Sequence, residues 1–411
     1  MLFNLNEFLM SISFALDFVE LDLTGATSNH SKRVSYICYK MGENLGFTSN
    51  QLYDLTSLAI LHDNGVSDKR LHDKSLGTSL NNFSLIERKK EHCIVSEKNI
   101  KSFPFSTNVS NVLLYHHENY DGTGYFSLLG PNIPLMSQII HLSDILDITF
   151  SLDHLNNEEH NKLLSFINDN RNIMFSDDIA NAFLNISKHK SFWLDLKTMF
   201  LTTALKNLIP SISIECSFKE LRNITKTISR IIDSKSPYTQ LHSSELAIKI
   251  EKLAKYYGEN EDDIYKLIIA ADLHDIGKLA VPNSILDAER KLTLDEYEVI
   301  KEHTYYTRVA LQGIEGFEDI VEWASNHHER LNGKGYPFGK IHTDLDFNSR
   351  LMGCLDVYQA LTESRPYRPS LTHTAAMQIL NDMKNDNLID SKITEDIDYI
   401  FGSNNLNHLN K

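Results

Sequence analysis

The sequence has few cysteines, and none has a close partner along the chain. Four occur in 411 residues, at Cys38, Cys93, Cys216 and Cys354. Such scattered cysteines indicate neither a disulfide framework nor a zinc site built on cysteine pairs. The chain therefore resembles a protein of a reducing compartment.

The chain also lacks positive charge and long apolar runs. Its formal net charge is −15, which disfavours general attraction to DNA, RNA or an anionic membrane. An anionic ligand would need a local basic pocket instead. No run of 18 apolar residues occurs, and no basic segment precedes the fairly apolar first 23 residues. We expect a cytoplasmic protein whose partners include neither a nucleic acid polymer nor a membrane.

Alternation of apolar and polar residues with period two is missing as well, so no sheet of any size is expected. Nearly every periodic segment has helical spacing. One apolar stripe ends at Gly258 and consists of Leu246, Ile250, Leu253 and Tyr257. The segment Thr293–Glu296 predicts a capping box that opens another helix. We expect an all-α fold.

What the chain does have is a repeat of histidines and aspartates about half a chain apart. Seven residues of the first half recur 211 or 212 positions later in the second half. The first set is His30, His62, Asp63, His92, His116, His117 and Asp144. The second set is His242, His274, Asp275, His303, His327, His328 and Asp356. The repeat predicts two tandem domains, residues 1–205 and 206–411, because it carries all seven in one register.

These residue types are metal ligands. Imidazole and carboxylate together suit iron, manganese, zinc or similar divalent ions. Seven ligands are too many for one tetrahedral ion and suit two ions that share a bridging carboxylate and a water. Two ions about 3.5–4 Å apart activate that water and neutralise a phosphoryl transition state. Any single histidine here could be an ordinary core or surface residue, but seven in register favour a metal centre.

Three motifs of the second half carry a family resemblance. They are Leu273–Lys278, His327–Pro337, and the block formed by Asp356–Tyr358 with Arg365–Arg368. Together they resemble the HD-GYP branch of the HD metal-dependent phosphohydrolase superfamily. The resemblance implies an all-helical fold of two tandem HD-type domains. It also implies hydrolysis of cyclic di-GMP to pGpG or GMP, or of 3'3'-cyclic GMP-AMP, by a hydroxide that bridges two metal ions.

The resemblance also assigns ligands to the two ions. One ion would be held by His242, His274, Asp275 and Asp356. Asp275 would bridge to a second ion, held by His303, His327 and His328. Iron and manganese are the metals most expected. Members with three ions carry a glutamate four residues before the first ligand histidine, where this chain has Tyr238 and Ala26, so two ions per site are expected.

Asp275 and Lys278 are the catalytic candidates, and further residues are candidates for substrate contacts. Lys278 would lie beside the scissile phosphate. Arg365 and Arg368 would reach phosphate oxygens, and Tyr336 would contact the substrate from its loop. Each has a plainer interpretation: a helix C-terminal cation for Lys278, a solvated turn for the arginines, and packing alone for Tyr336.

The first half keeps the ligands but differs around them. Val66 stands in place of Lys278, Gly124–Phe126 replaces the Gly-Tyr-Pro motif, and Asp153 occupies the position of Arg365. Each lost charge-assisted contact weakens binding by about 1.5–3 kcal/mol. We predict that the second half carries the turnover. The first half would be a metal-retaining regulatory or structural partner, or an enzyme for another substrate.

Two other functions stay open at this point. The chain could be a cyclic-dinucleotide or metal-sensing module without significant turnover, or a mononucleotide phosphohydrolase of the wider superfamily. Formation of a linear product separates the sensing module from an enzyme. The apolar stripe from Phe218 to Ile231 leaves monomer and homodimer open, because such a face is buried in its own domain more often than between subunits.

Overall fold

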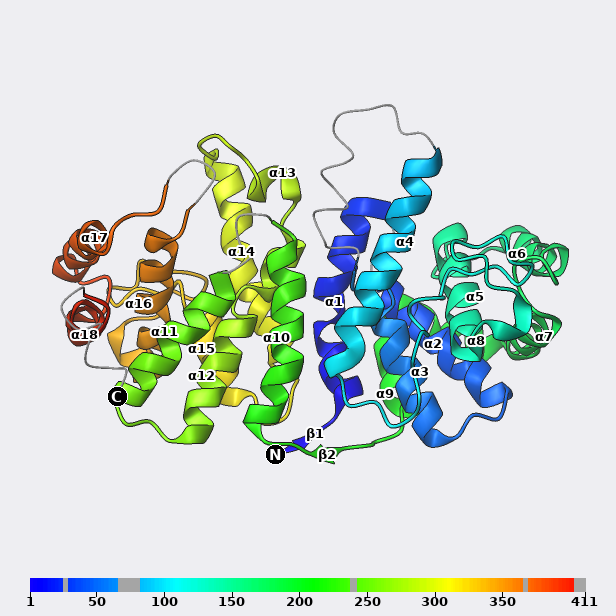
Figure 1. Cartoon of the computed structure of the whole chain (residues 1–411). Coiled ribbons are helices and arrows are strands. Elements are labelled where there is room, and N and C mark those ends of the chain that lie inside the picture. Colours follow the sequence, from blue (N-terminus) through cyan, green and yellow to red (C-terminus); the bar gives the residue numbers. More distant parts are fainter. Residues whose placement is uncertain (25–28, 66–81, 237–241, 365–368, 403–411) are drawn as a thin grey trace. The chain divides into compact units, whose positions relative to one another are not determined.

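The computed structural model describes residues 1–24, 29–65, 82–236, 242–364 and 369–402. These residues form eighteen α-helices (Figure 1). The one sheet in the described ranges pairs two-residue strands, β1 (Leu2–Phe3) and β2 (Ile214–Glu215). The expected all-α fold is confirmed. No helix in this part of the chain is both long enough and apolar enough to cross a membrane.

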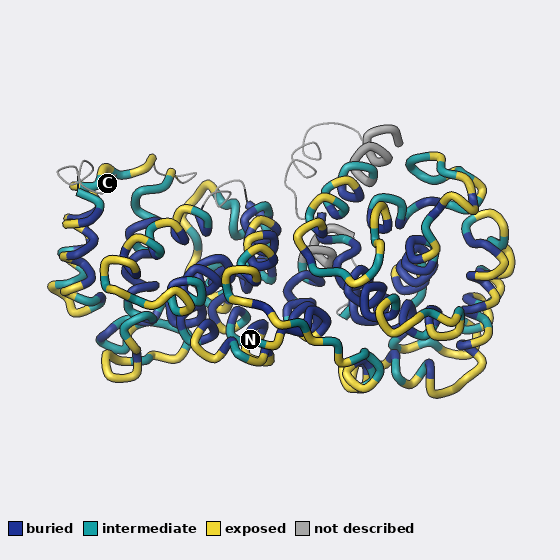
Figure 2. The backbone as a smooth tube through the Cα atoms, turned by 60° about the horizontal axis from the view of Figure 1, so that its bottom comes forward, coloured by how far each residue is buried: buried dark blue, intermediate teal, exposed yellow. Residues whose placement is uncertain are grey.

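The chain divides into two compact units. One is Leu2–Ile214, and the other is Glu215–Lys411 together with Met1. The expected boundary between residues 205 and 206 lies inside helix α9 (Thr198–Leu208), whereas the division in the structure follows that helix. Buried segments run through the interior of each unit (Figure 2).

The second unit is built around α12 (Glu261–Leu273). This helix packs against α10 (Phe218–Ser234), α11 (His242–Tyr256) and α15 (Glu318–Ser325). Helix α16 (Phe347–Thr362) packs against α11 and α15, and α17 (His373–Asn385) and α18 (Ser391–Phe401) pack against α16 (Figure 1). The remaining helical elements are the 3-10 turn η5 (Ile276–Ala280), α13 (Asn283–Leu286), α14 (Leu294–Leu311) and the 3-10 turn η6 (His342–Asp344).

Local signals explain where these helices begin and end. Helix α14 opens with the expected capping box, in which Thr293 and Glu296 exchange side-chain-to-backbone hydrogen bonds. Just after α11 ends, Gly258 adopts φ +75°, a conformation that glycine accepts without strain. The apolar stripe of α10 is buried at Leu221, Ile224, Ile228 and Ile231.

The first unit repeats this plan. Helix α2 (His30–Asn44) packs against α1 (Leu5–Thr24), α3 (Ser49–Leu61), α5 (Leu135–Thr149), α7 (Asp177–Ile186) and α9. The other elements are α4 (Asn82–Asn99), α6 (Asn157–Asp169), α8 (Lys190–Asp195) and the 3-10 turns η3 (Ile100–Ser102) and η4 (Gly130–Asn132). Helices α2, α3, α4 and α5 each begin 212 residues before α11, α12, α14 and α16. The sequence repeat is therefore also a repeat of helices.

Candidate metal centre

All seven ligand candidates of the second unit converge, although they come from distant segments. His242 is the first residue of α11, and His274 caps the C-terminus of α12. Asp275 follows directly, His303 lies within α14 and Asp356 within α16. The adjacent pair His327 and His328 comes just after α15. His328 is partly exposed, and the other six are buried.

Asp275 faces the histidines with both carboxylate oxygens. Its Oδ2 lies 3.3 Å from His274 Nε2, and its Oδ1 lies 3.5 Å from His303 Nε2 and 3.9 Å from His327 Nε2. A carboxylate that bridges two ions needs this two-sided arrangement.

Asp356 supports the other side of the cluster. Its Oδ1 lies 3.2 Å from His242 Nε2 and 3.8 Å from His274 Nε2. Three overlapping groups have donor atoms within 4.8 Å of one another. They are His242–His274–Asp356, His274–Asp275–His327 and His303–His327–His328.

Backbone carbonyls orient three of the imidazole rings. The Nδ1 atoms of His274, His303 and His327 donate to the carbonyls of the residues three positions earlier, at 2.8, 2.6 and 2.6 Å. A carbonyl only accepts hydrogen bonds, so the proton of each neutral ring lies on Nδ1. Each Nε2 lone pair is then directed into the cluster, as a metal ligand requires.

The electrostatics at His303, His327 and Asp275 also favour a cation. Burial lowers the pKa of His303 to about 4 and that of His327 to about 3, which keeps both rings neutral at physiological pH. Burial alone would raise the pKa of Asp275, yet the neighbouring His274 and Lys278 hold it well below its usual range. Neutral imidazoles and an ionised carboxylate are the forms in which these groups bind metals.

Two ligand atoms of the second unit are buried without a hydrogen-bond partner among the described residues. They are His274 Nε2 and Asp275 Oδ1. Leaving such an atom buried and unsatisfied costs about 1–3 kcal/mol. A divalent ion at this position would satisfy both, so the residues fit a metal centre.

Two carboxylates that the sequence did not reveal contact ligand candidates. Glu363 Oε2 lies 3.0 Å from His242 Nδ1. In the first unit Asp147 Oδ2 takes this role, 2.7 Å from His30 Nδ1. Glu363 follows Asp356 by seven residues but Asp147 follows Asp144 by three, so the repeat gave no signal for this pair.

The repeat could have revealed a further carboxylate, Glu329, because Glu118 occupies the corresponding position in the first half. Glu329 accepts hydrogen bonds from the backbone nitrogens of Phe338 at 2.7 Å and Lys340 at 2.9 Å. Glu118 does the same with Phe126 and Leu128. Each glutamate thus fixes the loop that follows its pair of histidines.

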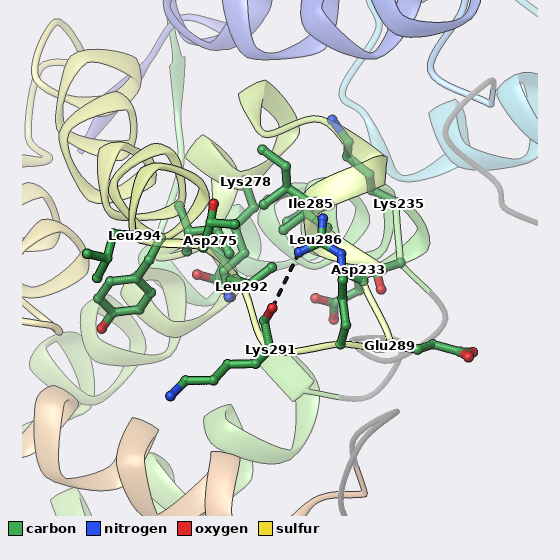
Figure 3. Close-up of a pocket in the computed structure, with 17 residues that line it drawn as sticks. Asp233, Lys235, Asp275, Lys278, Ile285, Leu286, Glu289, Lys291, Leu292 and Leu294 are labelled. Carbon is green, nitrogen blue, oxygen red and sulfur yellow. Dashed lines mark hydrogen bonds and ion pairs between the residues drawn. The ribbon is translucent and has the colours of Figure 1, made fainter.

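A cavity of about 680 Å³ opens beside the second cluster. Asp275 and Lys278 form part of its wall, and the segment from Ile285 to Leu294 forms much of the rest (Figure 3). Lys278 Nζ lies 2.5 Å from Asp275 Oδ2. The Tyr336 ring packs at a tilt of 40° against His328, with ring centroids 4.9 Å apart. Arg365 and Arg368 lie outside the described residues.

The first unit brings its own set of seven together. Asp63 Oδ1 lies 3.4 Å from His92 Nε2 and 3.5 Å from His116 Nε2. Asp144 Oδ1 lies 3.3 Å from His30 Nε2 and 3.6 Å from His62 Nε2, and His117 Nδ1 lies 3.8 Å from its other oxygen.

Asp153, which stands at the repeat position of Arg365, has a structural contact in the first unit. Asp153 accepts hydrogen bonds from the backbone nitrogen and hydroxyl of Thr198, at 2.8 and 2.9 Å. Its carboxylate therefore caps the start of α9. Val66 lies outside the described residues.

A close backbone approach supports both centres. A Cβ added to Gly277 would lie 1.9 Å from the carbonyl oxygen of His303, and one added to Gly65 would lie 2.4 Å from that of His92. Only glycine allows the segment after each His-Asp pair to pack this tightly on the helix that carries the next ligand.

The comparison with known families agrees with this geometry. The family model described as HD domain matches residues 20–161 and 226–393, which is more than half of the chain. The chain belongs to the HD domain family. Both matched segments of this HD-domain protein contain a complete set of seven ligand candidates, so the family match is duplicated as the sequence repeat is.

Relatives of this HD-domain protein confirm its resemblance to the HD-GYP branch. It is 28% identical to the "3'3'-cGAMP-specific phosphodiesterase 1" of Vibrio cholerae, over 95% of this chain and 90% of that protein. It is 32% identical to the "Cyclic di-GMP phosphodiesterase response regulator RpfG" of Xanthomonas campestris, over 39% and 43%. A crystal structure of a cyclic GMP-AMP-specific phosphodiesterase of V. cholerae (V-cGAP3) has the same fold, with a TM-score of 0.69, 24% identity and 98% coverage of both chains.

Proposed function

We propose that this HD-domain protein is a metal-dependent phosphodiesterase that hydrolyses a cyclic dinucleotide. The substrate would be cyclic di-GMP, opened to pGpG or GMP, or 3'3'-cGAMP. One observation carries the proposal: Asp275 lies between ligand histidines and Lys278 at the wall of a cavity. The names of the relatives support this substrate class.

The metal set of the second unit would hold two divalent ions, iron or manganese. His242, His274, Asp275 and Asp356 would hold one, and His303, His327 and His328 would hold the other with Asp275 shared. Such ions activate water and neutralise the charge that develops on a phosphoryl group. Histidine and carboxylate donors without a thiolate in the second set support this choice of metals.

The residues of the chain would bind and orient the phosphodiester. Lys278 extends from η5 to the cavity, where its ammonium would donate to a non-bridging phosphate oxygen. Tyr336, whose ring packs at a tilt against His328, would limit where the substrate lies against the ligand candidates. Arg365 and Arg368 would reach phosphate oxygens of the substrate. Glu363 would hold His242 in the orientation that its ligand role needs.

The volume and lining of the cavity suit an anionic small molecule such as a cyclic dinucleotide. Its volume of about 680 Å³ falls in the usual range of small-molecule sites, roughly 300–1,000 Å³. Four cations line it, against three carboxylates. The cations are Lys235, Lys278, Arg290 and Lys291, and the carboxylates are Asp233, Asp275 and Glu289. Cations therefore outnumber carboxylates by one in the lining, although the net charge of the chain is −15.

The test uses the full chain, loaded anaerobically with iron or manganese. Cyclic di-GMP, 3'3'-cGAMP and cyclic di-AMP are each incubated with it, and linear products are separated by chromatography. Asp275→Ala is expected to abolish product formation, whereas the matched variant Asp63→Ala retains it. Full hydrolysis by Asp275→Ala would exclude turnover in the second unit.

A sensing role is the second candidate, and the first unit favours it. Its ligands converge as those of the second unit do, but its sequence has Val66 where the second has Lys278. We propose that this unit is a metal-retaining regulatory partner of the catalytic unit. Saturable binding of a cyclic dinucleotide to the full chain, without linear product under any metal, would favour sensing for the whole protein.

A further inference from the structure

A cysteine lies among the histidines of the first unit. Cys93 follows His92 in α4, is buried, and its Sγ lies 3.5 Å from His92 Nε2. The donor atoms of His92, Cys93, His116 and His117 all lie within 4.8 Å of one another. Three nitrogens and one sulfur give four donors, the number that a closed tetrahedral zinc site uses.

The second unit offers no sulfur at this place. The repeat pairs His92 with His303, so Cys93 corresponds to Thr304. The Thr304 hydroxyl donates to the carbonyl of Lys301 at 3.0 Å and is thus turned to its own helix. The corresponding group in the second unit has three donors, His303, His327 and His328.

A separate observation indicates a ligand at the first cluster. His116 Nε2 is buried and has no hydrogen-bond partner within the part of the chain that the structure describes. The Nδ1 atom of the same ring donates to the carbonyl of Leu113 at 2.6 Å. The unsatisfied nitrogen is therefore held toward the other three donors. A histidine that binds a metal is oriented in the same way.

We propose that the first unit binds one zinc ion through the Cys93 thiolate together with His92, His116 and His117. Binding converts the thiol to a thiolate and releases its proton to solvent. A thiolate is a softer donor than a carboxylate, so this set prefers zinc to manganese, which the oxygen-richer second set accepts. Four protein donors leave no open position, so this ion stabilises or regulates rather than reacting with substrate.

The zinc site of the first unit is independent of the proposed hydrolysis. The first unit is expected to bind zinc whether or not the second unit turns over a substrate. This site also explains why the first unit retains its ligands although Val66 replaces the lysine of the second unit.

The experiment loads the full chain with Co²⁺, a spectroscopic substitute for zinc, and records the near-ultraviolet thiolate-to-cobalt absorption band. Wild type is expected to show the band, and zinc added afterwards removes it as cobalt is displaced. Cys93→Thr, which installs the residue of the second unit, is expected to lose the band and to weaken zinc binding at least about tenfold. Cys216→Ser is the matched control, since Cys216 bonds to a backbone carbonyl instead, and it keeps the band.

Two results would overturn the proposal. One is cobalt-loaded wild type without a thiolate band, a measurement that needs no variant to fold. The other is a folded Cys93→Thr, checked by circular dichroism, that keeps both the band and its zinc. Metal content by mass spectrometry is expected to fall by one zinc per chain in Cys93→Thr, with manganese in the second unit unchanged.

Discussion

At the scale of single residues, Lys278 separates the two units most clearly. It places an ammonium against the carboxylate proposed to bridge two ions, and the first half has no counterpart. Lys278→Ala is expected to reduce kcat by about 10²–10³-fold, the loss typical of one charge-stabilising donor. Steady-state hydrolysis of the preferred cyclic dinucleotide measures it, with metal content determined in parallel.

Lys291→Ala is the control for that substitution, because Lys291 also lines the cavity but forms no ion pair with a ligand candidate among the described residues. Its kcat is expected to stay within a few-fold of wild type. An unchanged kcat in Lys278→Ala would leave Lys278 with its plainer role, a cation at the end of a helical segment.

Titration of the Asp233 carboxyl is expected to make the free energy of unfolding depend on pH. Burial raises the pKa of this cavity carboxyl to about 7, although His242 and a hydrogen bond from Ser243 oppose the shift. Because the pKa of Asp233 is higher in the folded state than in the unfolded state, protonation of its carboxyl stabilises the fold. This stabilisation is complete below the unfolded-state pKa near 4 and is lost as pH rises through the folded-state pKa of about 7. In chelator-treated protein, the free energy of unfolding is expected to fall over this window, by at most about 4 kcal/mol.

Asp233→Asn removes the titrating group and keeps the shape of the side chain. Urea unfolding at intervals between pH 4 and pH 8 is expected to show a flatter profile for this variant. An identical slope in wild type and variant would mean that another group causes it.

At the scale of helices and loops, the sequence predicted much but not all. Periodicity, the capping box at Thr293 and the stop at Gly258 located helices correctly, because these signals are local. The ligand candidates were found because they repeat. Glu363 and Asp147 were not, since they reach His242 and His30 only through folding and do not correspond in the repeat. Cys93 was missed because one cysteine carries no spacing pattern.

The close packing of η5 on α14 depends on Gly277. In Gly277→Ala, the new methyl group would meet the carbonyl of His303 at 1.9 Å, and backbone atoms on both sides cannot turn away. The two elements must separate, which moves His303 from Asp275. We expect loss of about 1–3 kcal/mol in stability, together with reduced metal content and turnover of the second unit.

Gly65→Ala is the matched variant, because its Cβ would meet the carbonyl of His92 at 2.4 Å. It is expected to weaken metal binding in the first unit and to leave hydrolysis intact. Full metal content and activity in Gly277→Ala would show that the η5–α14 contact can relax without disturbing the ligands.

At the scale of the whole molecule, one helical plan has been used twice with different chemistry. Four helices of each unit, those that contain or precede the ligand candidates, begin 212 residues apart, so this part of the helical plan recurs in both units. The two halves of the sequence differ at positions close to the ligand candidates, such as Cys93 against Thr304 and Val66 against Lys278. The positions of the ligand candidates recur in both halves, and we expect the substitutions around them to decide which ion each unit binds.

Metal removal tests whether both units are metal-bound. An ion that binds only the folded state at 100 times its Kd stabilises that state by about 2.7 kcal/mol. Because the first and second units have separate ligand sets, a chelator is expected to lower the Tm of both in differential scanning calorimetry. Asp275→Ala should abolish the chelator-sensitive part of the second unit, and Cys93→Thr should reduce that of the first. A Cys93→Thr protein whose first unit responds to the chelator as wild type does would show that Cys93 does not hold an ion there.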